Sequence, residues 1–310
     1  MTRPTPTPAD AWPTLPYDAW AATKATLHRY CQIVGKVRMA LVPFRNHWWH
    51  VTLYPHTRGL TTGPMPAGDG RTVEIAFDLI DHRLIVSSSD GAIHRLALTD
   101  GLACMDFYRG LFDILDRLAV TVNIHPAPFD LQGPLLSEDR EHDAYDADAV
   151  VRYWTVLRNM AGVLEEFMGW FNGKQSPVHL FWHSFDLAQA RFSGRPAPPR
   201  PGADRVTAEA YSHEVIAFGF WPGDDKTRYP ALYSYTAPAP AGLVQQPLRP
   251  EEASWDPQAG TAYLAYEAVR TSAAPRSTVL DFFRSAYEAG AAAAGWDTTA
   301  FATAVAPRAP

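Results

Sequence analysis

Histidine and tryptophan side chains gather at Asn46-His47-Trp48-Trp49-His50, the densest group of chemically capable residues in the chain. An imidazole can act as a general acid or base, and tryptophan rings can line a pocket for a flat or sugar-like ligand. We therefore expect Trp49 to contact a substrate and His50 to act as a catalytic base. The alternative is that the tryptophans fill the core and the histidines cap buried polar groups.

A second aromatic and histidine-rich segment runs from His179 to Asp186. It supplies Trp182 as a predicted substrate-binding residue and Asp186 as a predicted carboxylate partner of a histidine. His179 and His183 are four residues apart, so on a helix they could share a metal ion. A strand is the better prediction after Ser-Pro, and there the two histidines would lie about 13 Å apart. A metal would therefore need one of the two histidines together with His50, His213 or Glu214, and His183 is the ligand predicted if a metal is present.

A third group is Tyr211-Ser212-His213-Glu214. A histidine beside a carboxylate suits acid–base catalysis, so His213 and Glu214 are predicted catalytic residues and Tyr211 a predicted substrate contact. On a strand, however, His213 and Glu214 would point to opposite faces. The alternative is a surface turn that precedes the next strand.

Arginines supply the predicted contacts to a charged substrate. Arg191 and Arg195 flank a Ser-Gly turn and could clamp a carboxylate or phosphate, since a guanidinium can bind such groups with two parallel hydrogen bonds. We expect Arg58 and Arg191 to form this clamp. The alternative is that these are surface arginines beside Pro-rich loops.

Composition limits the function classes. The 310 residues carry a net charge of −6, which disfavours a general nucleic-acid binder. Two cysteines, Cys31 and Cys104, do not make a disulfide framework, so we expect two small buried side chains. No signal peptide or membrane span is recognisable, which predicts a soluble, cytoplasmic protein. No Gly-rich phosphate-binding motif follows a predicted strand, so no nucleotide cofactor is predicted; oligomeric state is left open.

Hydrophobic periodicity predicts an alternation of helices and short strands. Helices are predicted at 17–34, 102–118, 150–168 and 278–294. Strands are predicted at 37–42, 50–54, 72–77, 83–87, 93–98, 120–124, 178–185, 215–221, 231–235 and 262–266. Short turns between alternating strands favour antiparallel sheets, so the predicted fold class is α+β.

The order helix, strands, helix occurs twice, which suggests an internal duplication. Trp49-His50 precedes Arg58 by the same interval that separates Trp182-His183 from Arg191. We expect a Pro-rich arm at 1–16, a first α+β repeat at 17–130, an acidic connector at 131–146, a second repeat with Pro-rich insertions at 147–296, and a flexible tail at 297–310. The alternative is similar helix chemistry and a coincidental Trp-His pair.

Several longer motifs resemble an uncharacterised bacterial family called domain of unknown function 5996. They are NHWWHV at 46–51, RGLTT at 58–62, IDHRL at 80–84, SFDLA at 184–188, RFSGR at 191–195 and YSHE at 211–214. The resemblance covers most of residues 12–298 and implies no activity. Sequences of this type often have Gly where this chain has His183, which puts a role of His183 in doubt.

Together these patterns predict one compact body with a polar, aromatic pocket between or beside two related halves. The leading hypothesis is an enzyme that acts on a small anionic metabolite by histidine and carboxylate acid–base chemistry. A non-catalytic small-molecule binder or sensor is the second hypothesis. A protein-interaction module that uses the Pro-rich loops as partner ligands is the third.

Overall fold

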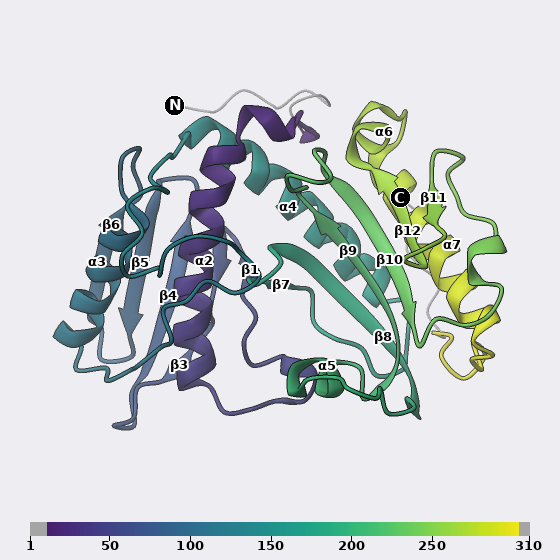
Figure 1. The fold of residues 1–310 in the computed structure, drawn as a ribbon, viewed down its shortest axis with the longest axis horizontal. Coiled ribbons are helices and arrows are strands. Elements are labelled where there is room, and N and C mark those ends of the chain that lie inside the picture. The colour runs from purple at the N-terminus through teal and green to yellow at the C-terminus, as the bar shows by residue number, and fades with distance from the viewer. Residues whose placement is uncertain (1–10, 304–310) are drawn as a thin grey trace. The chain divides into compact units, whose positions relative to one another are not determined.

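The computed structural model describes residues 11–303 and divides the chain into two compact units (Figure 1). The first unit contains Leu15–Trp154 and His179–Asp186. The second contains Met1–Thr14, Thr155–Val178 and Leu187–Pro310. The predicted Pro-rich arm and tail lie partly outside the described residues, at 1–10 and 304–310.

The helices of the first unit carry its core. They are the 3-10 turn η1 (Tyr17–Ala19), α2 (Ala21–Leu41), the 3-10 turn η2 (Asn46–Trp48) and α3 (Cys104–Arg117). The ring of Tyr30 from α2 stacks on Phe107 of α3 at 4.0 Å between ring centroids. Pro43 disfavours helical backbone at the residue before it, and Val42 is accordingly extended, so α2 ends there.

The first unit's sheet is antiparallel, in the order β1-β2-β4-β5-β6, with β3 paired to β4. The strands are β1 (Tyr54–His56), β2 (Gly59–Thr61), β3 (Met65–Pro66), β4 (Thr72–Asp78), β5 (Arg83–Ser88) and β6 (Ile93–Ala97). Alternate residues of β4 are buried, as a strand with one covered face requires, and Phe77 stacks parallel to Phe107 at 6.2 Å. The short strand β7 (His179–Phe181) also belongs to this unit, where the Leu180 and Leu53 backbones exchange two hydrogen bonds.

The second unit has its own antiparallel sheet, in the order β11-β12-β10-β9-β8. Its strands are β8 (Asp186–Pro196), β9 (His213–Trp221), β10 (Ala231–Ala237), β11 (Ser254–Asp256) and β12 (Thr261–Ala265). Its helices are most of α4 (Ala147–Met168), α5 (Arg205–Ala210), the 3-10 turn η3 (Leu243–Gln245), α6 (Tyr266–Thr271) and α7 (Pro275–Ala293). Two antiparallel sheets with separate helices confirm the predicted α+β class.

The predicted duplication is not confirmed. A long helix, a sheet and a final helix do occur twice in sequence order. However, Arg58 lies in the turn between β1 and β2, whereas Arg191 lies within β8. Similarly, Trp49 precedes β1 and Trp182 follows β7. The motif residues therefore do not occupy matching positions in their strands, and the duplication and the domain limits drawn from it stay predictions.

Some predicted elements were wrong. Residues 37–42, predicted as a strand, belong to α2 up to Leu41, because Val37 continues the buried face of a helix that is already formed. Residues 120–124 form no strand. Cys31 and Cys104 are buried free thiols, as predicted, and burial raises the pKa of both. Among the described residues, no helix is long and apolar enough to cross a membrane.

Candidate functional site

Arg38 in the last turn of α2 is a buried cation that pairs with no acid in the described part of the chain. Its side chain is 3% exposed, and Nη1 donates to the carbonyl oxygen of Thr62. Nη2 donates to the Tyr54 hydroxyl at 3.4 Å, whereas Nε has no hydrogen-bond partner in the described chain. Burial lowers the pKa of the guanidinium, which shows that the surroundings disfavour its charge.

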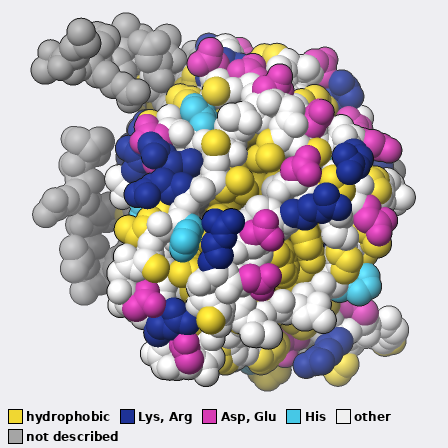
Figure 2. All heavy atoms as spheres, turned by 90° about the vertical axis from the view of Figure 1, so that its left-hand side faces the viewer, with side chains coloured by type: hydrophobic (Ala, Val, Ile, Leu, Met, Phe, Trp, Pro, Cys, Tyr) yellow, Lys and Arg dark blue, Asp and Glu magenta, His cyan; other side chains and the backbone are white. Residues whose placement is uncertain are grey.

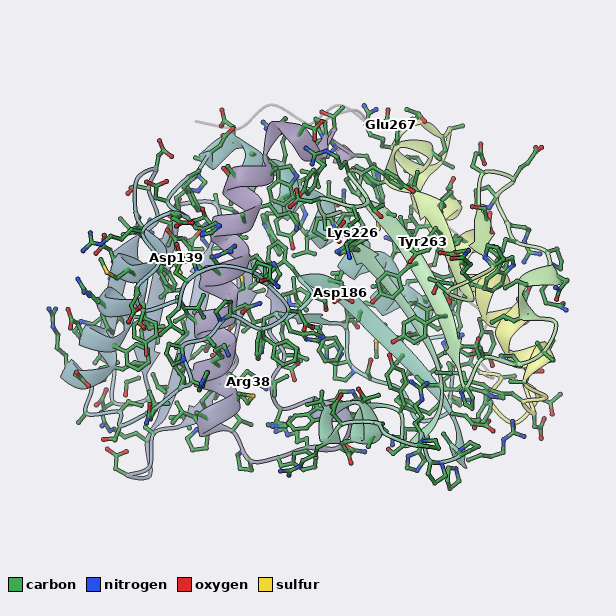
Figure 3. All side chains as sticks on the ribbon, viewed as in Figure 1. Arg38, Asp139, Asp186, Lys226, Tyr263 and Glu267 are labelled. Carbon is green, nitrogen blue, oxygen red and sulfur yellow. The ribbon has the colours of Figure 1, made fainter. Side chains whose placement is uncertain are left out.

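A second arginine of α2 shows the usual solution to the same problem. Arg29 is also buried, and its Nε lies 3.1 Å from a carboxylate oxygen of Asp139, which is itself fully buried. In Figure 3, Asp139 lies beside α2 while Arg38 lies near the C-terminal end of that helix. On the molecular surface, too, basic and acidic side chains lie interspersed, as the face in Figure 2 shows. Arg38 differs because no acid from residues 11–303 pairs with it.

Four further side chains surround Arg38, and with it they form what we call the Arg38 cluster: Arg45, His50, Tyr54 and His179. The Arg38 guanidinium carbon lies 5.1 Å from the centre of the Tyr54 ring, and the Tyr54 and His179 rings lie 6.4 Å apart. Burial and the nearby charge of Arg38 lower the pKa of His179 to about 3. The cluster is therefore cationic, with neutral histidines.

His50 is positioned by the loop that connects α2 to β1. Its side chain is 4% exposed, and Nδ1 accepts a hydrogen bond from the Arg45 backbone N–H at 3.3 Å. Burial lowers its pKa, and the charges of Arg38 and Arg45 lower it further. In the neutral ring the proton must therefore sit on Nε2, which makes that nitrogen a hydrogen-bond donor.

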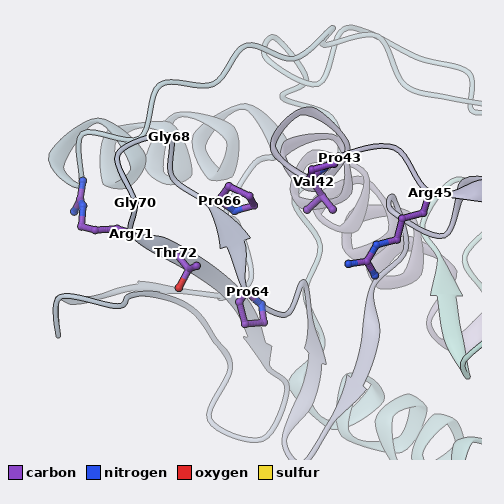
Figure 4. A pocket seen from close by; sticks show the side chains of 9 residues that line it. All are labelled: Val42, Pro43, Arg45, Pro64, Pro66, Gly68, Gly70, Arg71 and Thr72. Atoms are coloured by element: carbon purple, nitrogen blue, oxygen red, sulfur yellow. The ribbon is translucent and has the colours of Figure 1, made fainter.

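A shallow pocket of about 450 Å³ opens beside this loop (Figure 4). Its lining is mostly apolar or small: Val42, Pro43, Arg45, Pro64, Pro66, Gly68, Gly70, Arg71 and Thr72. Figure 4 shows the Arg45 guanidinium directed into the space beside Val42 and Pro64, and the Arg71 side chain directed away from it. Arg71 is already paired with Asp69 and Asp90, at 2.7 and 2.8 Å. Arg45 is thus the cation that the pocket offers to a ligand.

Arg38 is connected to the lining of this pocket through the backbone. Val42, which lines it, is one helical turn after Arg38 and donates its backbone N–H to the Arg38 carbonyl oxygen. Thr62, which accepts from the Arg38 guanidinium, is two residues before the lining residue Pro64. The backbone segments that line the pocket therefore also hold the Arg38 side chain in place.

The remaining predicted site residues of the first unit have other contacts. Arg58 forms ion pairs with Asp78 and Asp81, both at 2.8 Å. Trp182 is 4% exposed and donates from Nε1 to the Val51 carbonyl oxygen at 2.7 Å. Trp49 is half-buried beside the ring of His47, 5.2 Å away. The ion pairs of Arg58 and the hydrogen bond of Trp182 therefore stabilise the fold of this unit.

His183 lies in the turn between β7 and β8, and Asp186 is the first residue of β8. The Ser184 hydroxyl donates to Asp186 and lies 3.4 Å from Nε2 of His183. Burial lowers the pKa of His183, and the charge of Asp186 opposes this shift. The carbonyl oxygens of Trp182 and His183 both accept from Nε2 of buried His28, at 2.9 and 3.1 Å.

The other predicted residues belong to the second unit. Arg191 is 2% exposed in β8, with its guanidinium carbon 3.6 Å from the centre of the Phe167 ring, and burial lowers its pKa to about 9. Glu214 is paired with Arg195 at 2.7 Å, and Nδ1 of the adjacent His213 lies 3.2 Å from the Ser212 hydroxyl. The Tyr211 hydroxyl lies 3.1 Å from that of Tyr235. In this unit Arg191 is thus packed against aromatic rings, whereas His213 and Glu214 lie at the start of β9.

No group of three or more His, Cys, Asp or Glu residues in the described part of the chain is arranged to hold a metal ion. Of the Arg38 cluster, His50 was predicted as a site residue and His179 was considered only as a metal ligand, whereas Arg38, Arg45 and Tyr54 were not predicted. A weak signal was present, since Lys36 and Arg38 interrupt a stretch of α2 that contains no acid. Basic residues without an acid nearby in a largely apolar helix are a pattern that could have indicated the site.

The first unit is thus an α+β body with a pocket at the end of its long helix, whose lining includes Arg45 and, among the described residues, no Asp or Glu. The whole chain belongs to the family of unknown function DUF5996, which residues 12–303 match. No curated protein and no solved structure matches the chain.

Proposed function

We propose that the protein binds a small anion, a carboxylate or a phosphate, at the Arg38 cluster. The observation that carries this proposal is the buried guanidinium of Arg38, whose Nε has no partner among residues 11–303 and no acid nearby. A charge removed from water costs several kcal/mol unless it is paired and hydrogen-bonded. An anion would supply both the charge and the missing acceptor.

Arg45 and His50 extend the same logic. Arg45 directs a second guanidinium into the pocket, and the Nε2–H of His50 is a donor that suits an anionic oxygen. Three donors from three positions would fix the orientation of a carboxylate or phosphate. No acid competes with the ligand, since the described residues place none in the cluster.

This geometry favours binding over the acid–base enzyme. A general base needs an available lone pair, and the Nδ1 lone pair of His50 is occupied by the Arg45 amide. The carboxylates predicted as its partners, Asp186 and Glu214, accept from Ser184 and Ser193 respectively. The proposal is therefore a binding or sensing protein whose anion is held by Arg38, Arg45 and His50.

Calorimetric titration with acetate and with phosphate at constant ionic strength tests the proposal. We expect Arg38→Met to weaken binding roughly 10- to 100-fold, since a hydrogen bond to a charged group contributes about 1.5–3 kcal/mol. Arg117→Met is the matched control, because Arg117 is an exposed arginine of α3 in the same unit. Equal affinity in the wild type and in Arg38→Met, with both folded by circular dichroism, would refute the proposal.

A further inference from the structure

The loop between α2 and β1 carries three aromatic rings that contact one another, of which Phe44 is exposed, Trp48 half-exposed and His50 buried. Phe44 is 53% exposed, and its ring centroid lies 5.0 Å from that of His50 and 5.5 Å from that of Trp48. Trp48 in turn stacks on His50 at 5.4 Å. We call Phe44, Trp48 and His50 the aromatic corner. Phe44 and the half-exposed ring of Trp48 present flat apolar surface to a ligand.

The backbone of this loop is strained. His47 and Trp48 have φ values of 55° and 62°, two consecutive residues in the left-handed region that favours glycine. The arrangement places His47 inward, 4% exposed, and leaves Trp48 half-exposed against His50. Strain of this kind persists where the surrounding structure enforces it, often at ligand sites. Here it holds the Trp48 ring against His50 and Phe44, and Phe44 stands in the chain between the lining residues Pro43 and Arg45.

The pocket wall has the same chemistry. Val42 and Pro43 lead directly into Phe44 and Arg45, and Pro64 and Pro66 form the facing wall. Proline rings form rigid apolar surfaces, so this wall changes little when a ligand binds. A volume of about 450 Å³ is far larger than an acetate or a phosphate ion needs and lies within the usual range for small organic ligands.

The absence of acids sets a further limit on the ligand. A ligand with an ammonium group would need a carboxylate or several carbonyl acceptors to replace its hydration. The described residues of the Arg38 cluster and of the pocket lining include no Asp or Glu. The site therefore disfavours zwitterions such as amino acids.

We infer that the ligand is an aryl carboxylate or similar ring-bearing anion without a positive charge. Its anionic group would contact Arg38, Arg45 and His50, and its ring would lie against the aromatic corner and the proline wall. This inference rests on the proposed function and narrows it, since a bare anion would leave the aromatic corner and most of the pocket unused.

The test compares benzoate, acetate and phenylalanine as probes of the wild-type protein by calorimetry. We expect benzoate to bind at least ten-fold more tightly than acetate, and phenylalanine to bind no better than acetate. Equal affinity for benzoate and acetate would refute the inference that the ligand carries a ring. If Arg38→Met still lost its affinity for acetate, the proposed anion site would be retained. No binding of any of the three probes would refute both.

Two variants locate the preference. Phe44→Ala and Trp48→Gly should bring the affinity for benzoate down to that for acetate while acetate binding stays. Trp48→Gly removes the ring and also relieves the left-handed backbone, so it is expected to fold. Ile93→Ala is the control, because Ile93 is a comparably exposed apolar residue, 51% exposed, on β6. An undiminished preference for benzoate in both aromatic variants would overturn the inference.

Discussion

Arg29 and Arg38 lie on one helix and are both buried, yet within residues 11–303 an acid pairs with Arg29 and none pairs with Arg38. The sequence could not distinguish them, because Asp139 is more than a hundred residues from Arg29 along the chain and its approach depends on tertiary structure. For the same reason Arg58, predicted as a clamp, could not be seen to pair with Asp78 and Asp81. For a single residue such as His50, the sequence could suggest a role from its type and neighbours, and the structure adds the charges of Arg38 and Arg45 around it.

Buried histidines make the protein sensitive to acid. Burial lowers the pKa of His28 and of His179 to about 3, so both are neutral in the folded chain. Below their ordinary value of 6.5 only the unfolded chain binds the protons, so the free energy of unfolding falls as the pH falls from 6.5 toward 3. The slope is up to about 1.4 kcal/mol per pH unit for each histidine.

Urea unfolding at several pH values between 7 and 4 measures this slope. We predict that His179→Leu reduces the slope of the unfolding free energy against pH by the contribution of one histidine, up to about 1.4 kcal/mol per pH unit. Leucine does not titrate and fits a buried apolar position. A pH dependence in His179→Leu identical to that of the wild type would show that His179 is protonated to the same extent in the folded and the unfolded chain.

Within a helix, close packing can outweigh the helix propensity of a residue. Gly35 lies in the middle of α2, and a Cβ there would be 2.1 Å from Cδ1 of Trp182. Alanine favours a helix by about 1 kcal/mol over glycine. We nevertheless predict that Gly35→Ala destabilises the protein by about 1–3 kcal/mol, because the buried Trp182 ring would have to move.

Gly162 in α4 supplies the matched comparison for this prediction. A Cβ at Gly162 would meet only the end of the Arg276 side chain, at 3.9 Å. Gly162→Ala should therefore stabilise the protein by up to about 1 kcal/mol, as measured by the urea midpoint. Stabilisation by both substitutions would contradict the packing of Trp182 against α2.

Long periodic elements were predictable and short ones were not. The apolar spacing of 150–168 and the Asp90-Gly91 turn matched α4 and the β5–β6 hairpin closely. The short strands β1, β2 and β3 were missed or misplaced, because two or three residues carry no periodic signal and depend on their partners. The same holds for the left-handed backbone at His47 and Trp48, which no local preference of these residues favours.

At the scale of the whole molecule, the first unit is built from separate stretches of sequence. Residues 179–186 return to it with Leu180, which exchanges backbone hydrogen bonds with Leu53 at 2.7 and 3.0 Å. They also supply Phe185, whose ring stacks between those of His28 and Tyr153, at 4.9 and 5.3 Å. The unit is therefore incomplete without this distant segment.

We predict that a fragment of residues 15–154 alone shows no cooperative thermal unfolding, because it loses these backbone pairs and rings from its core. Circular dichroism of the fragment, compared with the full chain, measures this. Cooperative unfolding of the fragment near the melting temperature of the full chain would show that residues 179–186 contribute little to the unit.

The most direct test of the anion site is a crystal structure of the full chain soaked in selenate, with anomalous scattering used to locate the ion. We predict a selenium peak in the Arg38 cluster, with a selenate oxygen about 2.7–3.2 Å from Nε of Arg38. A carboxylate of the chain accepting from that Nε, with no ion beside it, would contradict the proposal that Arg38 is kept for an anionic ligand.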